Sequence, residues 1–372
     1  MLMVCTTCRQ LLPSNAEAKH TKNSFLMTRK YTPQGAPCQS GLDDSPANSY
    51  TPLMQDMMGG FFGLELPEYN NFPFTESEFC VFTNSGRTAL ACLLDNMPLP
   101  RRLYLPSYIC HTLEEPLADF KTETYGCRAD LTPILPDDAR KEDIIILVDY
   151  FGLTTRHVLN AAEQFPGLVI VDATTALFSN TGKLFPTFYS PRKFVGVPDG
   201  GVACAPFPLI RRPEAMLPSS ATALHLLQRI ESGILSAAES AQQAENALCR
   251  TRLAMSPLTR RLLRSIDFRT ISRKRLSNYH ILHQTLAPLN RLQLPEHPAA
   301  APMYYPFVCG IPGMRDDLID AGIALPLFWE EVIDSTPAHS IENWLARTLL
   351  PLPIDQRYDE NDMQKLLHLI LP

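Results

Sequence analysis

Two short apolar runs in the first half of the chain limit what it can fold into. Residues 143–148 (Asp-Ile-Ile-Ile-Leu-Val) and 167–171 (Gly-Leu-Val-Ile-Val) are rich in β-branched residues and are too short for buried helices. They do not alternate with polar residues, so both faces of each strand must be buried. That pattern is typical of the inner strands of a parallel sheet. Residues 102–105 predict a further strand.

Helical patterns separate these strands, at residues 87–94 and 158–164. Strands that alternate with helices predict an α/β fold, in which a parallel sheet is connected by right-handed crossovers. We expect a large α/β domain over residues 56–250 and a smaller C-terminal domain over residues 251–372. Residues 221–248 predict one long helix, with Ser219 or Ser220 as its N-cap.

The first 55 residues are rich in Ser, Thr, Asn, Pro and Lys and show no sustained periodicity, so we expect a flexible tail there. Met54, Met57 and Met58 follow it, and one of them is a candidate start of translation. Cys5 and Cys8 have the spacing of a zinc knuckle, but no second such pair follows. We therefore expect no metal site.

Charge and hydropathy exclude several classes of protein. The net charge of −6 argues against a nucleic-acid-binding protein, and no apolar run approaches the roughly 20 residues that span a bilayer. The N-terminus has neither a basic region nor a long apolar stretch of the kind found in secretory signals. In a chain with 45% hydrophobic and 19% charged residues, these features favour a cytoplasmic globular enzyme whose scattered cysteines are reduced.

One segment carries a pattern of reactive chemistry. In residues 189–201 a lysine, Lys193, stands three residues after Ser190, and the pair Gly200–Gly201 follows. A phosphate anchor beside a reactive lysine is what pyridoxal 5'-phosphate (PLP) needs to be held as a Schiff base. A lysine in a loop rich in Gly and Pro is also often a solvated surface residue.

Three other segments bear on this choice. Ser85-Gly86 leads into a predicted helix, whose free N–H groups and positive dipole end bind phosphate. Asp172 ends a predicted parallel strand, where α/β folds bind ligands, and a carboxylate there can pair with the PLP ring nitrogen. Tyr108 follows another strand, near the expected position of a planar ring. The alternatives are two ordinary helix N-caps and a tyrosine packed in a turn.

In this order, the segments match the fold-type I PLP enzymes. From about Gly59 to Leu371 the chain resembles the DegT/DnrJ/EryC1/StrS family of sugar-nucleotide aminotransferases, as a divergent and short branch. The resemblance rests on residues 84–90, 105–108, 150–152, 171–173 and 190–201, and more weakly on residues 255–259 and 351–355. It implies a mostly parallel sheet sandwiched by helices, with a smaller C-terminal α+β lobe.

The resemblance assigns roles to single residues. Lys193 would bind the cofactor and move a proton between the substrate carbon and the cofactor. Because free lysine has a pKa near 10.4, the site must favour its neutral form or the imine. Asp172 would pair with the pyridine nitrogen, and Tyr108 would pack near the ring. The phosphate would be held by Ser85, Gly86, Thr88 and Ser190.

The chain departs from the family at three of these positions. Arg87 replaces the usual Thr or Asn after Ser-Gly, and it either reinforces anion binding or points to solvent. Thr175 stands where a Gln or His often contacts the ring hydroxyl. Cys110 stands where an aromatic residue is frequent. Members with histidine at the lysine position are dehydratases, so Lys193 argues against that reaction.

The expected activity is transfer of an amino group, from glutamate, to a keto-sugar nucleotide by a homodimer. The product would enter a surface polysaccharide or a glycosylated metabolite. Two alternatives stay open: another fold-type I reaction, by a lyase or an aminotransferase of small keto acids, and a non-catalytic regulator that binds PLP or a sugar nucleotide. Nine basic residues in 250–275 either bind the anionic nucleotide or form a solvated helical face.

Overall fold

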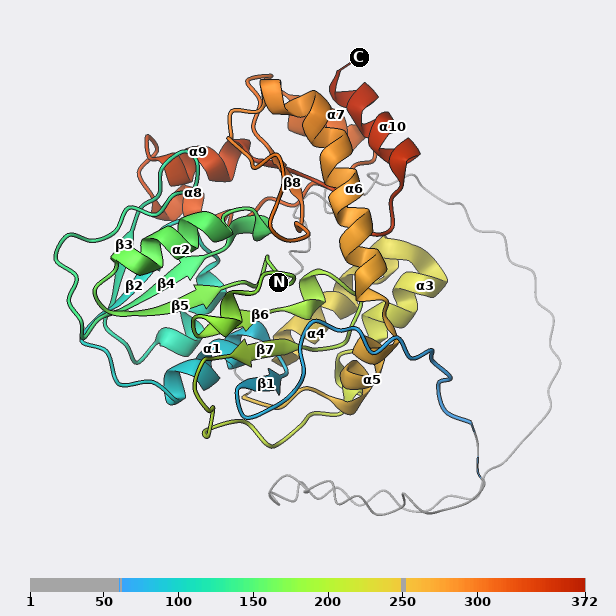
Figure 1. Ribbon diagram of the computed structural model, residues 1–372. Coiled ribbons are helices and arrows are strands. Elements are labelled where there is room, and N and C mark those ends of the chain that lie inside the picture. The colour runs from blue at the N-terminus through green and yellow to red at the C-terminus, as the bar shows by residue number, and fades with distance from the viewer. Residues whose placement is uncertain (1–59, 61, 249–251, 372) are drawn as a thin grey trace, which may run out of the picture. The chain divides into compact units, whose positions relative to one another are not determined.

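The computed structural model describes residues 60, 62–248 and 252–371 (Figure 1). The predicted tail, the candidate start methionines, the Cys5/Cys8 pair and Arg250 therefore lie outside the described residues. The strands are β1 Cys80–Thr83, β2 Leu103–Pro106, β3 Thr122–Tyr125, β4 Ile144–Val148, β5 Leu168–Asp172, β6 Thr187–Tyr189, β7 Gly201–Cys204, β8 Tyr305–Phe307 and β9 Leu350–Leu352.

The first seven strands form one sheet in the order β1-β7-β6-β5-β4-β2-β3 (Figure 1). The strands β3, β2, β4, β5 and β6 pair in parallel with one another, whereas β7 is antiparallel to both β1 and β6. In the parallel part, Val148 of β4 lies beside Asp172 of β5. The ends of these two strands therefore meet at one edge of the sheet.

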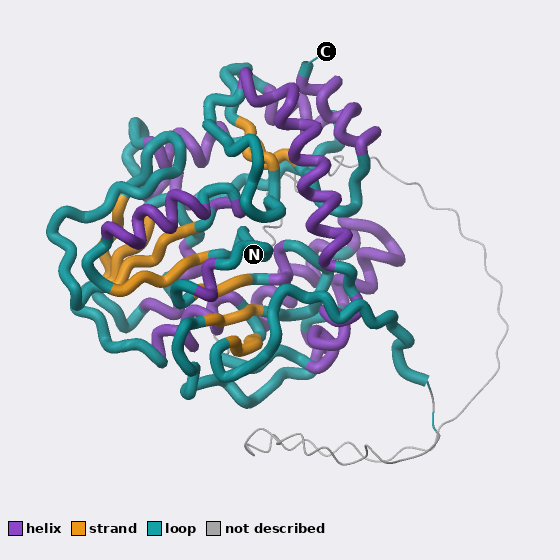
Figure 2. Tube along the Cα trace, in the orientation of Figure 1, coloured by secondary structure: helices purple, strands orange, loops and turns teal. Residues whose placement is uncertain are grey.

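Helices lie between and after the strands, as the purple and orange segments of Figure 2 show. The α-helices are α1 Gly86–Asp95, α2 Thr155–Gln164, α3 Leu224–Ser236, α4 Ala238–Leu248, α5 Pro257–Ser265, α6 Phe268–Leu286, α7 Met314–Asp320, α8 Glu331–Ser335, α9 Ile341–Thr348 and α10 Glu360–Ile370. The short 3-10 turns are η2 His111–Leu113, η3 Glu115–Leu117, η4 Tyr150–Gly152, η5 Thr181–Lys183, η6 Pro191–Lys193, η7 Ser219–Ala221 and η8 Ala287–Leu289.

The apolar runs behave as the sequence predicts. All five residues of β4 are buried, and four of five in β5, because helices and loops cover both faces of the sheet. Residues 65–372 belong to one compact unit, which holds all these elements. The fold class is confirmed: a mostly parallel sheet with flanking helices, followed by a part with the two-stranded sheet β8-β9.

The single helix predicted over residues 221–248 is wrong. The chain forms η7, then α3 and α4, which are separated at Ala237. Inside α3, Gly233 has a φ of +84°, a left-handed conformation that interrupts the helix and suits glycine. Neither predicted serine caps α3, whose N-cap is Ala223.

Two hydrophobic clusters stabilise the described chain. The larger one contains Leu90 of α1, Ile146 of β4 and Val171 of β5. The smaller one joins α6, β8, β9 and α10 through residues such as Tyr279, Tyr305 and Leu366. In Figure 1, α6 runs from α5 towards α7 and α10. It therefore links the sheet region to the C-terminal elements.

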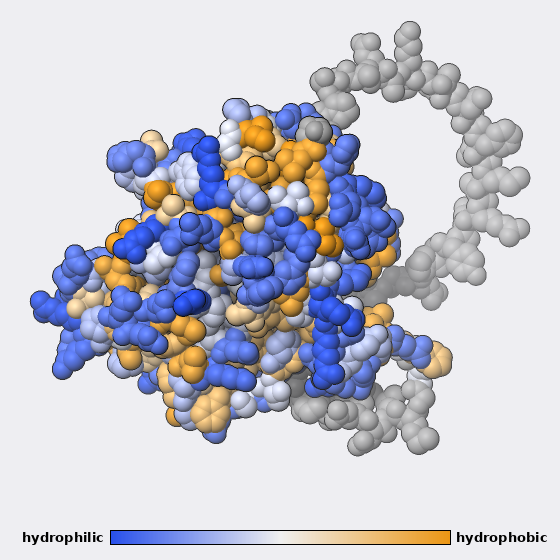
Figure 3. Space-filling model, turned by 45° about the horizontal axis from the view of Figure 1, so that its top comes forward, coloured by the Kyte–Doolittle hydropathy of each residue, from blue (hydrophilic) through white to orange (hydrophobic). Residues whose placement is uncertain are grey.

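Apolar residues also reach the surface, as the face drawn in Figure 3 shows. Within the described residues, no helix is both long enough and apolar enough to cross a membrane. The same residues contain no group of His, Cys, Asp and Glu side chains able to hold a metal ion. Their six cysteines are free thiols.

Candidate active site

Lys193 lies in a tight turn that follows β6. Ser190 is the N-cap of η6, and Lys193 is the last residue of this turn. The Lys193 Nζ donates a hydrogen bond to Thr174 Oγ1 (2.9 Å). The amine therefore points towards the loop after β5 and not into solvent, which argues against the solvated surface lysine that was the alternative.

Asp172 ends β5 and is only 5% exposed. Its Oδ1 accepts a hydrogen bond from the backbone N–H of Thr174 (2.8 Å). Burial raises the pKa of Asp172, while the charge of Lys193 and the hydrogen bonds from Thr174 act in the opposite direction. Thr174 thus lies between Asp172 and Lys193 and forms hydrogen bonds with both.

The turn from β1 into α1 meets the same place. Ser85 is the N-cap of α1, and its Oγ accepts a hydrogen bond from the N–H of Thr88 (3.2 Å). A Cβ atom on Gly86 would lie 3.3 Å from Thr174 Cγ2 and 3.8 Å from Ser190 Cβ. The start of α1 is therefore in contact with both the Asp172 loop and the Lys193 turn.

The pair Gly200–Gly201 serves close backbone packing. A Cβ on Gly201 would lie 2.1 Å from the carbonyl oxygen of Ser85, so no other residue fits there without movement of the backbone. Gly200 has a φ of +136°, and its N–H donates to the carbonyl of Asn84 (2.7 Å). These contacts join the start of β7 to the Ser85 turn.

Arg87 does not point to solvent. Its Nη2 forms an ion pair with Glu245 of α4 (3.1 Å), and its Nε lies 3.7 Å from Glu115. Arg192, which precedes Lys193, also pairs with Glu245 (2.9 Å). Despite burial, the charges of these two arginines lower the pKa of Glu245 to about 2. Glu245 thus joins the phosphate turn predicted at Ser85 to the turn that holds Lys193.

Tyr108 lies in an aromatic cluster. Its side chain is fully buried, with its ring centroid 4.6 Å from that of Trp329 and 5.5 Å from that of Tyr150. Its neighbour Cys110 is buried as well, and burial raises the pKa of the Cys110 thiol while the charge of Lys193 lowers it. The hydrogen bonds of this thiol with Thr112 lower its pKa more than the charge of Lys193 does.

Thr175 holds a strained turn. Its hydroxyl donates to the carbonyl of Asp149 (3.0 Å) and accepts from the N–H of Phe151 (3.1 Å). Phe151 has a φ of 59°, a left-handed conformation that is unusual for a bulky residue. The Thr175 hydroxyl thus binds backbone groups at the end of β4. At the start of α1, the other predicted threonine, Thr88, donates a hydrogen bond from its Oγ1 to Asn84 Oδ1 (2.6 Å).

Asp149, beside Asp172 at the end of β4, has an unusual pKa. Its carboxylate is fully buried, and burial raises the pKa to about 6 even though Thr154 and Thr155 donate hydrogen bonds to it. The folded chain therefore keeps this proton at pH values where the unfolded chain has lost it. As a result, the free energy of unfolding falls as pH rises from about 4 to about 6.

We expect Asp149→Asn to remove this loss. We compare the free energy of unfolding of the variant with that of wild type at each pH. This difference should favour the variant by about 2 to 3 kcal/mol more at pH 8 than at pH 4. Urea unfolding at the two pH values measures the difference. An equal effect of the substitution at both would show that the pKa of Asp149 is unchanged by folding.

Several of the nine basic residues have structural partners. Arg252 pairs with Asp95, Arg260 with Glu76 and Arg261 with Glu68. Arg275 is buried, whereas Arg269 is exposed at the start of α6. The solvated or structural interpretation thus holds for most of this stretch.

Sequence reasoning missed Thr174 and Glu245. Thr174 lies between Asp172 and Lys193, and its place directly after a strand-end aspartate was the available signal. Glu245 is 53 residues from Arg192, and no local pattern marks it.

No family model matches the chain, and no curated protein matches its sequence. Solved structures do match. The sugar aminotransferase CalS13 from Micromonospora echinospora aligns with 15% identity and a TM-score of 0.53, over 78% of this chain and 86% of that one. A DegT DnrJ EryC1 StrS aminotransferase from Brucella abortus aligns with 16% identity and a TM-score of 0.50, over 78% and 84%.

A third match is a GDP-4-keto-6-deoxymannose-3-dehydratase with a trapped PLP-glutamate geminal diamine. It has 13% identity and a TM-score of 0.52, over 78% of this chain and 89% of that one. At such identities a structural match establishes the fold and leaves the substrate open. The protein therefore shares the fold of these two aminotransferases and of this dehydratase.

Proposed function

We propose that the protein is a PLP-dependent aminotransferase. The observation that carries the proposal is that three segments distant in sequence meet in one place. Thr174 forms hydrogen bonds with both Lys193 and Asp172. Gly86, at the start of α1, lies against Thr174 and Ser190. An amine, a buried carboxylate and a helix N-terminus in one place are the groups that PLP requires. Proteins of this fold that hold PLP or its glutamate adduct support the same cofactor.

The residues present fit the cofactor. The start of α1 offers backbone N–H groups, and the Ser190 side chain makes no capping hydrogen bond of its own. Because Gly86 has no side chain, the space between the start of α1 and Thr174 stays open. Ser85, Gly86 and Ser190 would therefore hold the phosphate. When bound, PLP supplies an electron sink for the carbanion formed at the substrate carbon.

Two side chains do the chemistry that belongs to the protein. The Lys193 amine would hold the cofactor and would afterwards carry the proton to or from the substrate carbon. Burial makes the Asp172 carboxylate costly to ionise, and a protonated ring nitrogen of the cofactor would stabilise its charged form.

We infer that glutamate is the donor and a keto-sugar nucleotide the acceptor, because the proteins of this fold act on sugars and one holds a glutamate adduct. The product would enter a surface polysaccharide or a glycosylated metabolite. Lys193 favours amino transfer over dehydration. The free thiols of the described cysteines fit work in the reducing cytoplasm.

Titration with PLP tests the proposal. The protein should turn yellow, and reduction with borohydride should fix one cofactor mass on the peptide that contains Lys193. Glutamate alone should then convert the bound cofactor to its amine form. A lyase would not stop at that form, and a regulator would show no turnover with any keto-sugar nucleotide. A colourless protein that ignores PLP would falsify the proposal.

We also propose a homodimer. Helix α3 exposes an apolar row, in which Ile230 is 83% exposed and Leu224, Leu227, Ile234 and Leu235 are more than half or half exposed. An unpartnered row of this kind marks an interface. We expect light scattering to give twice the chain mass, and Ile230→Arg to shift it to one chain mass. A wild-type protein of one chain mass would contradict the dimer.

A further inference from the structure

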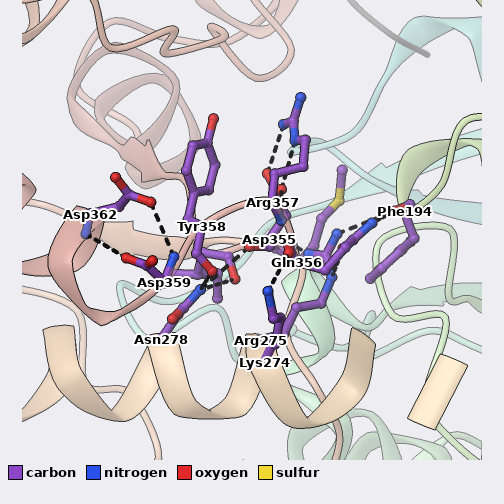
Figure 4. Close-up of polar contacts among 12 residues, drawn as sticks. Phe194, Lys274, Arg275, Asn278, Asp355, Gln356, Arg357, Tyr358, Asp359 and Asp362 are labelled. Atoms are coloured by element: carbon purple, nitrogen blue, oxygen red, sulfur yellow. Dashed lines mark hydrogen bonds and ion pairs between the residues drawn. The ribbon is translucent and has the colours of Figure 1, made fainter. Parts of the chain in front are cut away.

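The carbonyl oxygen of Phe194, the residue after Lys193, is held by two side chains from the C-terminal part of the chain. Gln356 Nε2 donates to it (2.9 Å), and Arg275 Nη2 donates to it at 3.4 Å. Arg275 Nε in turn donates to Gln356 Oε1 (3.1 Å). The three groups form a closed triangle of hydrogen bonds, which Figure 4 shows beside α6.

Several contacts hold the Arg275 side chain in this position. Its side chain is nearly fully buried, and its Nη1 donates to the carbonyl of Met303 (2.8 Å). Its guanidinium also lies 4.8 Å from the ring centroid of Phe194, as a cation–π contact. Burial lowers the pKa of Arg275 to about 10, so it still carries its charge at neutral pH. The nearby carboxylate of Asp355 is engaged by Arg357 (2.7 Å and 2.8 Å).

Gln356 is fixed as firmly. Its loop, residues 354–358, is bound to α6 by Asn278 Nδ2, which donates to the carbonyls of Ile354 and Tyr358 (both 3.2 Å). Lys274 Nζ donates to the carbonyl of Gln356 itself (3.2 Å). Helix α6 therefore holds both members of the pair that bind the Phe194 carbonyl (Figure 4).

The turn that carries Lys193 needs such support. It is a three-residue 3-10 turn, a conformation with poor hydrogen-bond geometry that is seldom stable by itself. Its internal bonds, from the N–H groups of Lys193 and Phe194 to Ser190 and Pro191, are 3.2 Å and 2.9 Å long. Contacts to Phe194 therefore fix the backbone from which the long and flexible lysine side chain extends.

We propose that Arg275 and Gln356 are positioning residues, which set the reactive geometry of Lys193 through the Phe194 carbonyl. They act on the lysine backbone and do not touch the reacting atoms. The proposal rests on the proposed function for its catalytic consequence only. The mechanical part, a turn held by α6 and the loop of residues 354–358, is independent of it.

The mechanical part is tested without cofactor, on the full chain, by amide hydrogen exchange. In Gln356→Leu, which keeps the side-chain size but removes both hydrogen bonds, the peptide of residues 190–197 should exchange at least tenfold faster. The peptide of β5 should be unchanged. Arg273→Gln, an exposed neighbour on α6, is the matched control. Unchanged exchange at residues 190–197 in Gln356→Leu would overturn the proposal.

The catalytic part is tested with PLP bound. Gln356→Leu should lower kcat about tenfold, leave KM for glutamate within twofold, and move the pH midpoint of the visible absorbance. Arg275→Lys, which can still donate to the carbonyl, should retain more activity than Arg275→Met. Faster exchange with unchanged kcat and pH midpoint would overturn the positioning role. A wild-type chain that binds no PLP would refute the proposed function, while the exchange result still decides the mechanical part.

Discussion

Lys193→Ala should bind PLP without holding it covalently and should lose transamination by a factor on the order of 10⁴. The variant removes both the group that binds the cofactor and the group that moves the proton. The fold should survive, because Lys193 is partly exposed and makes one side-chain hydrogen bond, to Thr174. Absorbance spectra, borohydride labelling and rates with glutamate measure the effect.

Lys183 provides the matched control. It is exposed and ends turn η5, as Lys193 ends η6, and it has no role in the site. Lys183→Ala should keep the yellow colour and the rate of wild type. Covalent labelling that persists in Lys193→Ala, on another lysine, would show that Lys193 is not the cofactor lysine.

Asp172→Asn should lower kcat by roughly 10²- to 10⁴-fold, the kinetic equivalent of losing a buried charge pair of about 3 to 5 kcal/mol. Without cofactor, the same variant should be at least as stable as wild type at neutral pH. Burial raises the pKa of Asp172, so ionising it opposes folding, whereas an amide oxygen still accepts the N–H of Thr174. A residue that weakens the empty protein and strengthens catalysis is typical of an active site.

A substitution at Asp199 serves as the control, because it shows what the loss of a buried carboxylate outside the site does to stability. Asp199 is equally buried but accepts hydrogen bonds from the N–H and hydroxyl of Ser256 and from the Thr259 hydroxyl. Burial raises the pKa of Asp199 as well, but both of its carboxylate oxygens accept hydrogen bonds and an amide nitrogen cannot accept one, so Asp199→Asn should destabilise the chain. An Asp172→Asn variant that loses stability and keeps its rate would assign Asp172 a structural role.

The sheet was predictable because its signal is local. Apolar runs at residues 143–148 and 167–171 correspond to β4 and β5, and residues 87–94 correspond to α1. The interruption of α3 at Gly233 and the separation of α3 from α4 at Ala237 were not predicted. Leu227, Ile230 and Ile234 keep helical spacing across Gly233, so periodicity alone hides the left-handed residue. The exposure of these three side chains could not be predicted either, because the spacing of apolar residues does not show what they contact.

The site was predictable only in part. Lys193, Asp172 and Ser85 stand beside recognisable strand and helix ends, and the structure brings their segments together. Their roles with a cofactor stay predictions. The two side chains that bind the Phe194 carbonyl left no signal, because Arg275 and Gln356 are 81 and 162 residues away from Phe194 in the sequence. Contacts over such distances are set by the folded topology.

The same distance has a consequence for synthesis on the ribosome. A chain that grows at about 5 to 20 residues per second needs roughly 8 to 32 seconds to pass from Phe194 to Gln356. The residues of the sheet and of the lysine turn are therefore synthesised before Gln356, which binds the Phe194 carbonyl. A chain that stops short of Gln356 would thus contain all the strands from β1 to β7 but would lack one of the two side chains that bind the Phe194 carbonyl.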